Sequence, residues 1–272
     1  MKSSVLRLPA SGTLVIGTDL QGNLADFQQL HRRFEALGDD AQLVLTGDLV
    51  HGPDDATAAQ WPDFLGTPYV DASPALIEAF AAAQVKAPGR VHCLMGNHDH
   101  SHLGGPVVQK FHDDEGAHLE AKLGPEGTSR WRALAGGFPL VAIAPCGVVM
   151  THAAPSLALD SVEQLEGIAW DVHAGDAIET FCKRPVLGAL LWARSAKDEV
   201  VAQFLRVLGG SVAVFGHDVV REGFAREGAQ QVCVSTSFGL FDEQKVFVQV
   251  DLSGKYPNAD ALREGVELRK LY

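Results

Sequence analysis

Five short apolar segments of this chain end in the same way, each in a cluster of Gly, Asp, Asn or His. They read TLVIGTD, QLVLTGD, RVHCLMGNHD, GVVMTHAAP and SVAVFGHD. Short apolar runs that stop at turn-forming residues are typical of buried β-strands that lead into loops. The pattern therefore predicts a sheet protein in which polar residues collect at the ends of the strands.

Amphipathic segments lie between these strands. Asn23 is a candidate helix N-cap, with Asp26 three residues later. It is followed by apolar residues at a spacing of three to four, namely Leu24, Phe27, Leu30, Phe34 and Leu37. The segments SPALIEAFAAAQVK and AKDEVVAQFLRVL have a similar character. Strands that alternate with such helices predict an α/β fold.

The C-terminal part changes character. The stretch GFAREGAQQVCVSTSFGLFDEQKVFVQVDL predicts a β-rich meander with turns near Gly228 and Asp242, and thus a mixed sheet. Segments 100–139 and 155–197 have weak periodicity, so we expect them to be helical or irregular inserts outside the sheets that could cover a site. We find no internal repeat and no linker, and we expect residues 1–272 to form a single domain.

Composition excludes several partners. The net charge is −12 and no basic run is present, which argues against binding to nucleic acid or to anionic membranes. The N-terminal sequence MKSSVLRLPASG has no sustained apolar region, and no stretch of about 18 apolar residues occurs anywhere. We therefore expect a cytoplasmic protein. Composition does not address the oligomeric state.

The cysteines support the same compartment. Four cysteines are far apart and include no CxxC pair: Cys93, Cys146, Cys182 and Cys233. Most of them lie in apolar, strand-like contexts, so we predict buried free thiols in a reducing compartment.

Polar residues of the kinds that do chemistry follow the five predicted strands: Asp19, Asp48, Asn97 with His98, His152, and His217. Any one of them has a structural interpretation as a turn residue, a helix cap or a satisfied polar side chain. Functional residues of open α/β sheets, however, collect at the carboxyl ends of strands. All five positions together indicate a functional site.

The ordered motifs TDLQGNLADF, LTGDLVHGPD, LMGNHD, MTHAAPS, LLWAR and VFGHDVVREGF resemble the calcineurin-like metallophosphoesterase superfamily. Its pattern is DxH, GDxxD, GNH(D/E), a later His, and a final GHxH or single His. The order is most similar to the phosphoprotein-phosphatase branch and its bacterial relatives. The resemblance extends over nearly the whole chain. It implies a four-layer α/β/β/α sandwich with two mixed β-sheets.

The resemblance also implies a centre of two divalent metal ions that share one carboxylate, that of Asp48. Two such ions polarise the phosphoryl group and make hydroxide available near neutral pH. One ion would be held by Asp48, Asn97, His152 and His217. This mixture of oxygen and imidazole ligands suits Mn, Fe or Zn.

The other ion would be held by Asp19, Gln21 and Asp48, and here the chain departs from the pattern. Gln21 places an amide oxygen where the family has an imidazole. The amide oxygen is a weaker ligand than imidazole, and it favours Mn²⁺ or Mg²⁺. We expect weak or no occupancy at this first site. Some Mn-dependent pyrophosphatase members also resemble DxQ, so Gln21 is compatible with activity. The single His217, followed by Val219 in place of a second His, also occurs in the phosphatase branch.

Residues next to the metals follow the family pattern only in part. His98 matches the proton donor, which would act as general acid toward the leaving oxygen. The Asp that orients this His and an Arg that grips phosphate are replaced by His51 and Gly52. Arg194 matches a second phosphate-binding Arg of bacterial relatives, with a surface ion pair as its structural alternative. Arg221 is a weaker candidate.

Additional histidines crowd these loops: His51, His100 and His102. Solvated or supporting roles are the ordinary interpretation, and a replacement ligand or a proton carrier is the alternative.

Three functions remain open from the sequence. The first is hydrolysis of a phosphomonoester on a small molecule or a phosphoprotein, with His98 and Arg194 as catalytic residues. The second is hydrolysis of a pyrophosphate or phosphodiester, such as a dinucleoside polyphosphate, because the Arg at position 52 is absent. The third is a non-catalytic metal-binding protein, because Gln21, His51 and Gly52 all depart from the pattern.

Overall fold

The computed structural model describes residues 4–55, 57 and 60–272. Its strands are β1 (Val5–Arg7), β2 (Thr13–Gly17), β3 (Gln42–Leu45), β4 (Val91–Cys93), β5 (Val141–Ile143), β6 (Val148–Met150), β7 (Val212–Phe215), β8 (Phe224–Arg226), β9 (Gln231–Val234), β10 (Val246–Asp251) and β11 (Leu268–Lys270). Its α-helices are α1 (Leu24–Glu35), α3 (Ser73–Lys86), α4 (Asn97–His100), α5 (Glu115–Ala135), α6 (Ile178–Phe181), α7 (Leu187–Leu191) and α8 (Asp198–Leu208). Short 3₁₀ turns are η1 (Asp63–Leu65), η2 (Ser101–Leu103), η3 (Val162–Leu165) and η4 (Ala259–Ala261).

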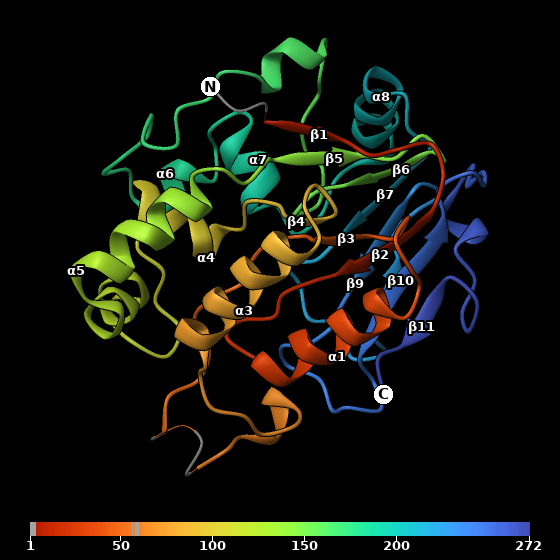
Figure 1. The fold of residues 1–272 in the computed structure, drawn as a ribbon. Helices are drawn as coiled ribbons and strands as arrows, with labels where there is room; N and C mark the ends of the chain where they lie inside the picture. Colours follow the sequence, from red (N-terminus) through yellow and green to blue (C-terminus); the bar gives the residue numbers. More distant parts are fainter. Residues whose placement is uncertain (1–3, 56, 58–59) are drawn as a thin grey trace.

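The strands form two mixed sheets. One sheet has the order β11-β10-β2-β3-β4, in which β2, β3 and β4 are parallel and β10 is antiparallel to β2. The other has the order β1-β5-β6-β7-β9-β8, in which β6, β7 and β9 are parallel. In Figure 1 both sheets lie behind α1 and α3.

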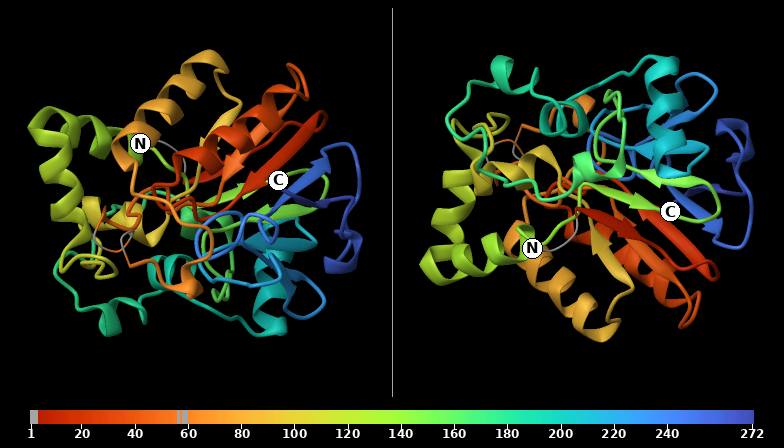
Figure 2. Two further views of the ribbon diagram at one scale, coloured as in Figure 1. Left: turned by 90° about the horizontal axis from the view of Figure 1, so that it is seen from below. Right: turned by 90° about the horizontal axis from the view of Figure 1, so that it is seen from above.

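The alternation of side chains along each strand creates the layers. In β2, Leu14 and Ile16 pack between the two sheets, whereas Val15 faces the helices with Phe27 and Leu30 of α1. Successive strand residues point to opposite faces, so a strand buried on both sides can support two apolar layers. Helices α1 and α3 cover one sheet and α8 covers the other (Figure 2). The predicted α/β/β/α sandwich is confirmed.

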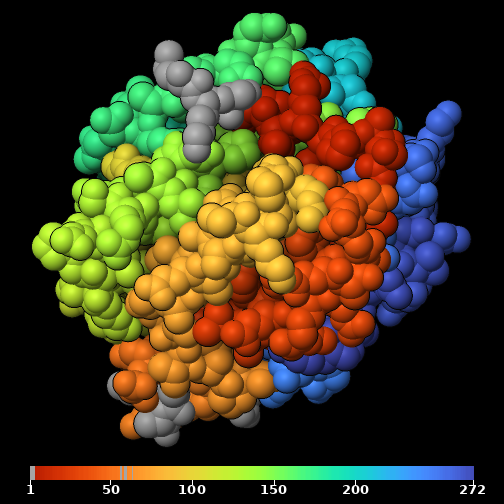
Figure 3. Space-filling view, viewed as in Figure 1, coloured from red at the N-terminus to blue at the C-terminus, as the bar shows by residue number. Residues whose placement is uncertain are grey.

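Helix α1 forms as its sequence predicts. The side chain of Asn23 accepts a hydrogen bond from the backbone N–H of Asp26 at 3.1 Å, which satisfies one of the free donors of the first turn. Phe27, Leu30 and Phe34 are buried on one face. In the space-filling view of Figure 3, α1 and α3 lie side by side and hide the sheet beneath them.

A buried ion pair ties α1 to the C-terminal part of the chain. The ammonium of Lys245 lies 2.8 Å from Asp26 Oδ2, and the two side chains are 2% and 1% exposed. Ser237 and Tyr272 also donate hydrogen bonds to the Asp26 carboxylate. Asp26 therefore joins α1, the segment before β10 and the last residue of the chain.

The predicted C-terminal meander is wrong in one respect. β8 and β9 form an antiparallel pair joined by a turn at Gly228, as expected. β10, however, pairs with β2 in the other sheet. The chain therefore crosses between the sheets after β9. The sequence did not predict this crossing, because an alternating apolar pattern does not specify which strand will be the partner.

The two insert-like segments contain no strand and lie outside the sheets. α5 is the longest helix of the first segment and bends at Gly124, which has a φ of +66° and precedes Pro125. The second segment holds η3, α6 and α7. Cys93, Cys146 and Cys233 are buried free thiols, but Cys182 follows α6 and is exposed, which corrects the prediction for that residue. Among the described residues, no helix has the length and apolar character needed to cross a bilayer.

Candidate metal centre

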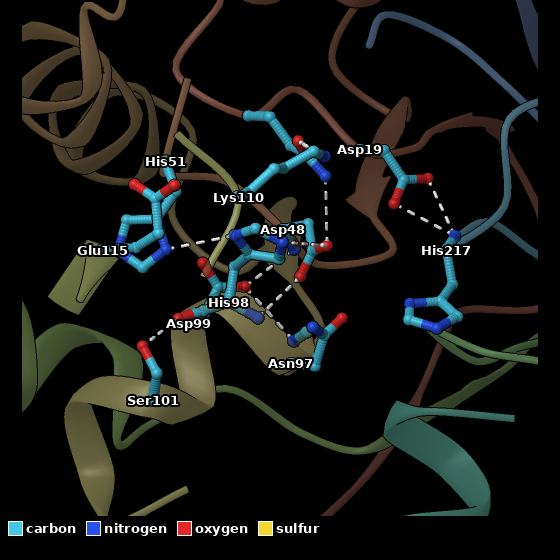
Figure 4. Close-up of polar contacts among 12 residues, drawn as sticks. Asp19, Asp48, His51, Asn97, His98, Asp99, Ser101, Lys110, Glu115 and His217 are labelled. Carbon is cyan, nitrogen blue, oxygen red and sulfur yellow. Dashed lines mark hydrogen bonds and ion pairs between the residues drawn. The ribbon is translucent and has the colours of Figure 1, made fainter. Parts of the chain in front are cut away.

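The polar residues predicted at strand ends converge. Asp19, Asp48, His152 and His217 follow β2, β3, β6 and β7, and Asn97 begins α4 after β4. Because the strands within each set are parallel, their carboxyl ends meet at a common edge. Figure 4 shows Asp19, Asp48, Asn97 and His217 arriving there from separate elements.

Unusual backbone conformations hold these loops. Asp19, Asp48 and His217 have φ angles of +48°, +53° and +68°, and Gln21 and His51 have +42° and +73°. Residues other than glycine rarely adopt this left-handed region, which costs about 1–3 kcal/mol each. Such conformations persist where surrounding contacts impose them and are concentrated at functional sites.

Four donor atoms lie around one point. His152 Nε2 is 2.9 Å from Asn97 Oδ1 and 3.1 Å from His217 Nδ1. It is also 3.5 Å from Asp48 Oδ1. Adjacent ligands of an octahedral ion with bonds of about 2.1 Å lie about 3 Å apart. The spacing is therefore that of ligands around one divalent cation, and the residues fit such an ion.

The histidines are in the state that a metal requires. The Nδ1 atom of His152 lies 3.0 Å from the carbonyl oxygen of Thr46, which can only accept, so Nδ1 carries the proton and Nε2 presents its lone pair. Burial lowers the pKa of His152, and burial together with His152 places the pKa of His217 well below its ordinary value. Neutral imidazoles are the form that binds metals.

Asp99, the last residue of GNHD, shapes the Asp48 loop. Its Oδ2 accepts the backbone N–H groups of Asp48 at 2.8 Å and Gly96 at 3.2 Å, and its Oδ1 accepts that of Leu49 at 3.1 Å. These bonds replace the water that the loop loses on burial. Asp99 thus fixes the direction in which the Asp48 carboxylate points.

The first metal position of the family pattern is arranged differently. Both carboxylate oxygens of Asp19 lie 3.0 Å from the backbone N–H of His217. The amide of Gln21 donates through Nε2 to Asp48 Oδ2 at 3.3 Å, and its Oε1 accepts from Lys110 Nζ at 2.5 Å. The amide oxygen of Gln21 therefore faces an ammonium group, and this position does not fit a second cation.

Lys110 belongs to the loop between η2 and α5. Lys110 is exposed to solvent and lines a pocket. Desolvation lowers the pKa of Lys110 to about 8, and Asp48 and Asp19 act in the opposite direction. The pocket has a volume of about 240 Å³ and is also lined by Gln21, Asp48, Asn97, His98, Trp192, Arg194 and His217.

Arg194 also lines this pocket, but its guanidinium is engaged. Arg194 Nη1 donates to Asp218 Oδ1, next to His217, and its side chain is 63% exposed. Because the pair is largely in solvent, it is weak enough for a phosphate to compete with it. Arg221 lies elsewhere: it donates to the carbonyl oxygen of Gly239 at 2.7 Å and lines a neighbouring apolar pocket with Val219.

His98 lines the pocket beside Asp48. Its Nε2 lies 3.8 Å from Asp48 Oδ2, and its backbone N–H donates to Asp48 Oδ1 at 3.0 Å. Its Nδ1 lies 3.1 Å from Nδ1 of His51. His51 Nε2 in turn lies 2.9 Å from Nε2 of His102. The three rings form a continuous line that starts at the pocket.

His100 takes no part in this line. Its Nε2 donates to the carbonyl oxygen of Trp170 at 2.7 Å, and its ring packs against Trp170 and Phe181. This histidine anchors the segment that contains α6.

Sequence reasoning missed three polar residues of the site: Asp99, Lys110 and Glu120. Asp99 is the last residue of the GNHD motif, and its place three residues after Gly96 is a signal for a side chain that accepts a backbone N–H at the start of a helix. Lys110 lies in the weakly periodic segment VVQKFHDD, and Glu120 lies on an ordinary amphipathic helix. We find no sequence signal that distinguishes these two residues from surface charges.

The similarity of this chain to known proteins agrees with this geometry. The sequence model of the family described as calcineurin-like phosphoesterase matches residues 13–221. The chain belongs to the calcineurin-like phosphoesterase family. It is therefore a metallophosphoesterase, a hydrolase that acts on phosphate esters, and Asp48, His152 and His217 form a candidate metal site in it. No curated protein matches the chain in sequence.

Solved structures resemble this phosphoesterase in fold. A protein serine/threonine phosphatase from Saccharomyces cerevisiae is 15% identical, with a TM-score of 0.66, and the match covers 92% of this chain and 77% of that one. A cold-active protein-tyrosine phosphatase from a psychrophilic Shewanella species is 14% identical, with a TM-score of 0.60, over 92% and 78% of the two chains. At such identity the likeness establishes the fold alone.

Proposed function

We propose that this phosphoesterase hydrolyses phosphate monoesters with a divalent metal ion held by Asp48, Asn97, His152 and His217. The observation that supports this proposal is one small pocket in which the metal-binding side chains share their walls with His98, Lys110 and Arg194. When bound, the metal would polarise a phosphoryl oxygen and acidify a water molecule. Its mixed oxygen and nitrogen donors suit Mn²⁺, which is the expected ion, with Fe, Zn or Mg as alternatives.

The charges of the pocket suit a terminal phosphoryl group. A monoester is a dianion at neutral pH and needs more positive charge than a diester. Lys110 and Arg194 bring an ammonium and a guanidinium to the same cavity. In this proposal Lys110 compensates for the Arg that Gly52 replaces, which favours a monoester over a diester. Arg194 can bind two phosphoryl oxygens through its planar fork.

His98 is the proposed general acid. Its Nδ1 is engaged by His51, so Nε2 is the atom available to the pocket. In its imidazolium form, which carries protons on both Nδ1 and Nε2, His98 can transfer the Nε2 proton to the leaving oxygen as the ester bond breaks. Its place beside Asp48 keeps Nε2 close to the metal-binding side chains.

A comparison of two substrates tests this proposal. Protein loaded with Mn²⁺ should release nitrophenol from nitrophenyl phosphate faster than from bis(nitrophenyl) phosphate. Peptides that carry phosphoserine, phosphothreonine or phosphotyrosine would then separate a phosphoprotein substrate from a phosphorylated small molecule. A preference for the diester would support the pyrophosphate or phosphodiester alternative. Absence of any product would support the non-catalytic alternative.

Arg194→Ala provides a matched test of phosphate binding. We expect it to raise KM for nitrophenyl phosphate, because a charged hydrogen bond contributes about 1.5–3 kcal/mol. Arg130→Ala is the control, since Arg130 is also exposed and pairs with a single carboxylate, that of Glu126. Equal effects of the two substitutions would contradict the role of Arg194.

A further inference from the structure

We propose that the ammonium of Lys110 occupies the place of the first metal ion, so that this phosphoesterase uses one divalent cation and one lysine. The inference deepens the proposed function, and its main test does not depend on turnover.

The first argument is the use of the donor atoms. Oε1 is the one atom of Gln21 that can bind a cation, and it accepts a hydrogen bond from Lys110 Nζ at 2.5 Å. The other amide atom, Nε2, donates to Asp48 Oδ2 at 3.3 Å. His152 contacts the other carboxylate oxygen of Asp48, Oδ1, at 3.5 Å, so the Gln21 amide engages the oxygen that this histidine leaves free.

The second argument is charge. Asp19 and Asp48 are 7% and 1% exposed, and the ammonium of Lys110 reaches them through the Gln21 amide that contacts Asp48. Two carboxylates deep in a protein need a positive partner. With a cation at the second metal position and an ammonium at the first, both charges are compensated. A further divalent ion would have to displace the ammonium.

The third argument is that Lys110 is held in place. Its Nζ lies 3.4 Å from the centre of the Phe238 ring, a contact that favours a cation. Its neighbours Phe111 and His112 donate backbone N–H groups to the carboxylate of Glu115, at 2.5 and 3.3 Å. The loop is therefore anchored on both the aromatic side and the helix side.

The departure at position 21 is consistent with this arrangement. An amide carries an acceptor and a donor side by side, so Gln21 can accept from Lys110 and donate to Asp48 at the same time. This network accounts for glutamine where the family pattern has histidine.

Metal stoichiometry tests the inference. Protein stripped with chelator and titrated with Mn²⁺ should bind one equivalent, and its electron paramagnetic resonance spectrum should be that of an isolated ion. The double variant Gln21→His/Lys110→Met should bind two equivalents and give the signal of an exchange-coupled pair. Lys86→Met, which removes a surface lysine that pairs with Glu35, should bind one equivalent like the parent.

The outcomes are separable. Two equivalents or a coupled signal in the unsubstituted protein would overturn the inference, whether or not the double variant folds. A double variant that folds, as judged by circular dichroism, and still binds one equivalent would also count against it. One equivalent without hydrolysis of any ester would refute the proposed function and leave the lysine assignment standing.

A different set of contacts supports a second inference. We infer that Glu120 of α5 positions His98 through His102 and His51. Glu120 Oε1 lies 2.9 Å from His102 Nδ1, which continues the line of rings described above. Arg132 holds the Glu120 carboxylate through Nε and Nη2 at 2.8–3.0 Å.

The proton positions follow from the end of this line. A carboxylate can only accept, so His102 carries its proton on Nδ1 and accepts at Nε2. His51 then donates from Nε2 and accepts at Nδ1, and His98 donates from Nδ1. The orientation of His98 is thereby determined by Glu120, which does not itself line the pocket. Position 51, where the family has an orienting Asp, here carries a ring that passes this role to Glu120.

Leaving-group dependence tests this positioning role. Glu120→Ala should lower kcat for phenyl phosphate by about 10- to 100-fold, as losses of outer ligand partners do, with little change in KM. The loss for nitrophenyl phosphate should be smaller, because that leaving group needs less help from an acid. Glu126→Ala, an exposed substitution on the same helix, is the control.

Rescue separates positioning from a structural role. His51→Asp places a carboxylate directly beside His98, so Glu120→Ala should have no further effect on kcat in that background. Equal losses for both substrates, or an additive loss in the His51→Asp background, would overturn the inference.

Discussion

Replacing Lys245 by methionine should destabilise the fold strongly. The substitution keeps the aliphatic stem but removes an ammonium that lies 3.0 and 2.8 Å from the two carboxylate oxygens of Asp26. Breaking a buried ion pair by removing one partner costs about 3–5 kcal/mol, because the remaining charge is uncompensated. Asp26 retains neutral donors from Asn23, Ser237 and Tyr272, so we expect a loss of about 3 kcal/mol, at the lower end of that range.

Urea unfolding followed by circular dichroism measures this loss, with a lower midpoint and an unchanged slope. Thermal unfolding should show a fall in Tm of about 6–12 °C for a domain of this size. Lys86→Met is the control, because the Lys86 side chain is 73% exposed and its pair with Glu35 should contribute about 0–1 kcal/mol. A loss below about 1 kcal/mol for Lys245→Met would refute the reasoning that the Asp26 charge depends on this ammonium.

Three further predictions concern the metal centre. Asp99→Asn should lower the free energy of unfolding by about 1–3 kcal/mol, because one backbone N–H then faces the amide donor of Asn. Metal affinity measured by calorimetry should fall by about 10- to 100-fold. Unchanged affinity would show that Asp99 does not orient the Asp48 loop. Gly47→Ala should lower the urea midpoint more than Gly38→Ala. Both positions have positive φ, but only a Cβ added at position 47 would meet a backbone atom, the nitrogen of Gly96 at 2.6 Å. Equal losses would contradict this clash. With Mn²⁺ supplied at about 100 times its Kd, chelation should lower the free energy of unfolding by about 2.7 kcal/mol, seen as a lower Tm. His152→Ala should abolish this effect of chelation on Tm. An effect that is retained in the variant would place the ion elsewhere.

Much of the fold and the strand-end residues of the candidate metal site could be predicted because their signals are local. Apolar runs followed by Gly, Asp or His identified the strands that precede Asp19, Asp48 and His217, and Asn23 identified the start of α1. Each of these signals depends on neighbours a few residues away, which set backbone preference and burial. The order of the motifs then led to the family.

The remaining features depend on contacts between distant parts of the chain. The pairing of β10 with β2 rather than with β9, and the exposure of Cys182, follow from how the two sheets and the inserts pack. Glu120 is connected to His98 only because α5 packs beside η2, which carries His102, and beside α4, which carries His98. A pattern of residues along one segment contains no information about which side chain from another segment will fill the space next to it.

The amino-acid sequence by itself determined which donor atoms this phosphoesterase possesses, including the amide of Gln21 in place of an imidazole. Only the tertiary structure decided what that amide contacts. Lys110 is separated from Gln21 by 89 positions, yet its ammonium lies 2.5 Å from the amide oxygen. The strength of a hydrogen bond or a charge interaction depends on distance through space, and this distance is set by the packing of the loop that carries Lys110.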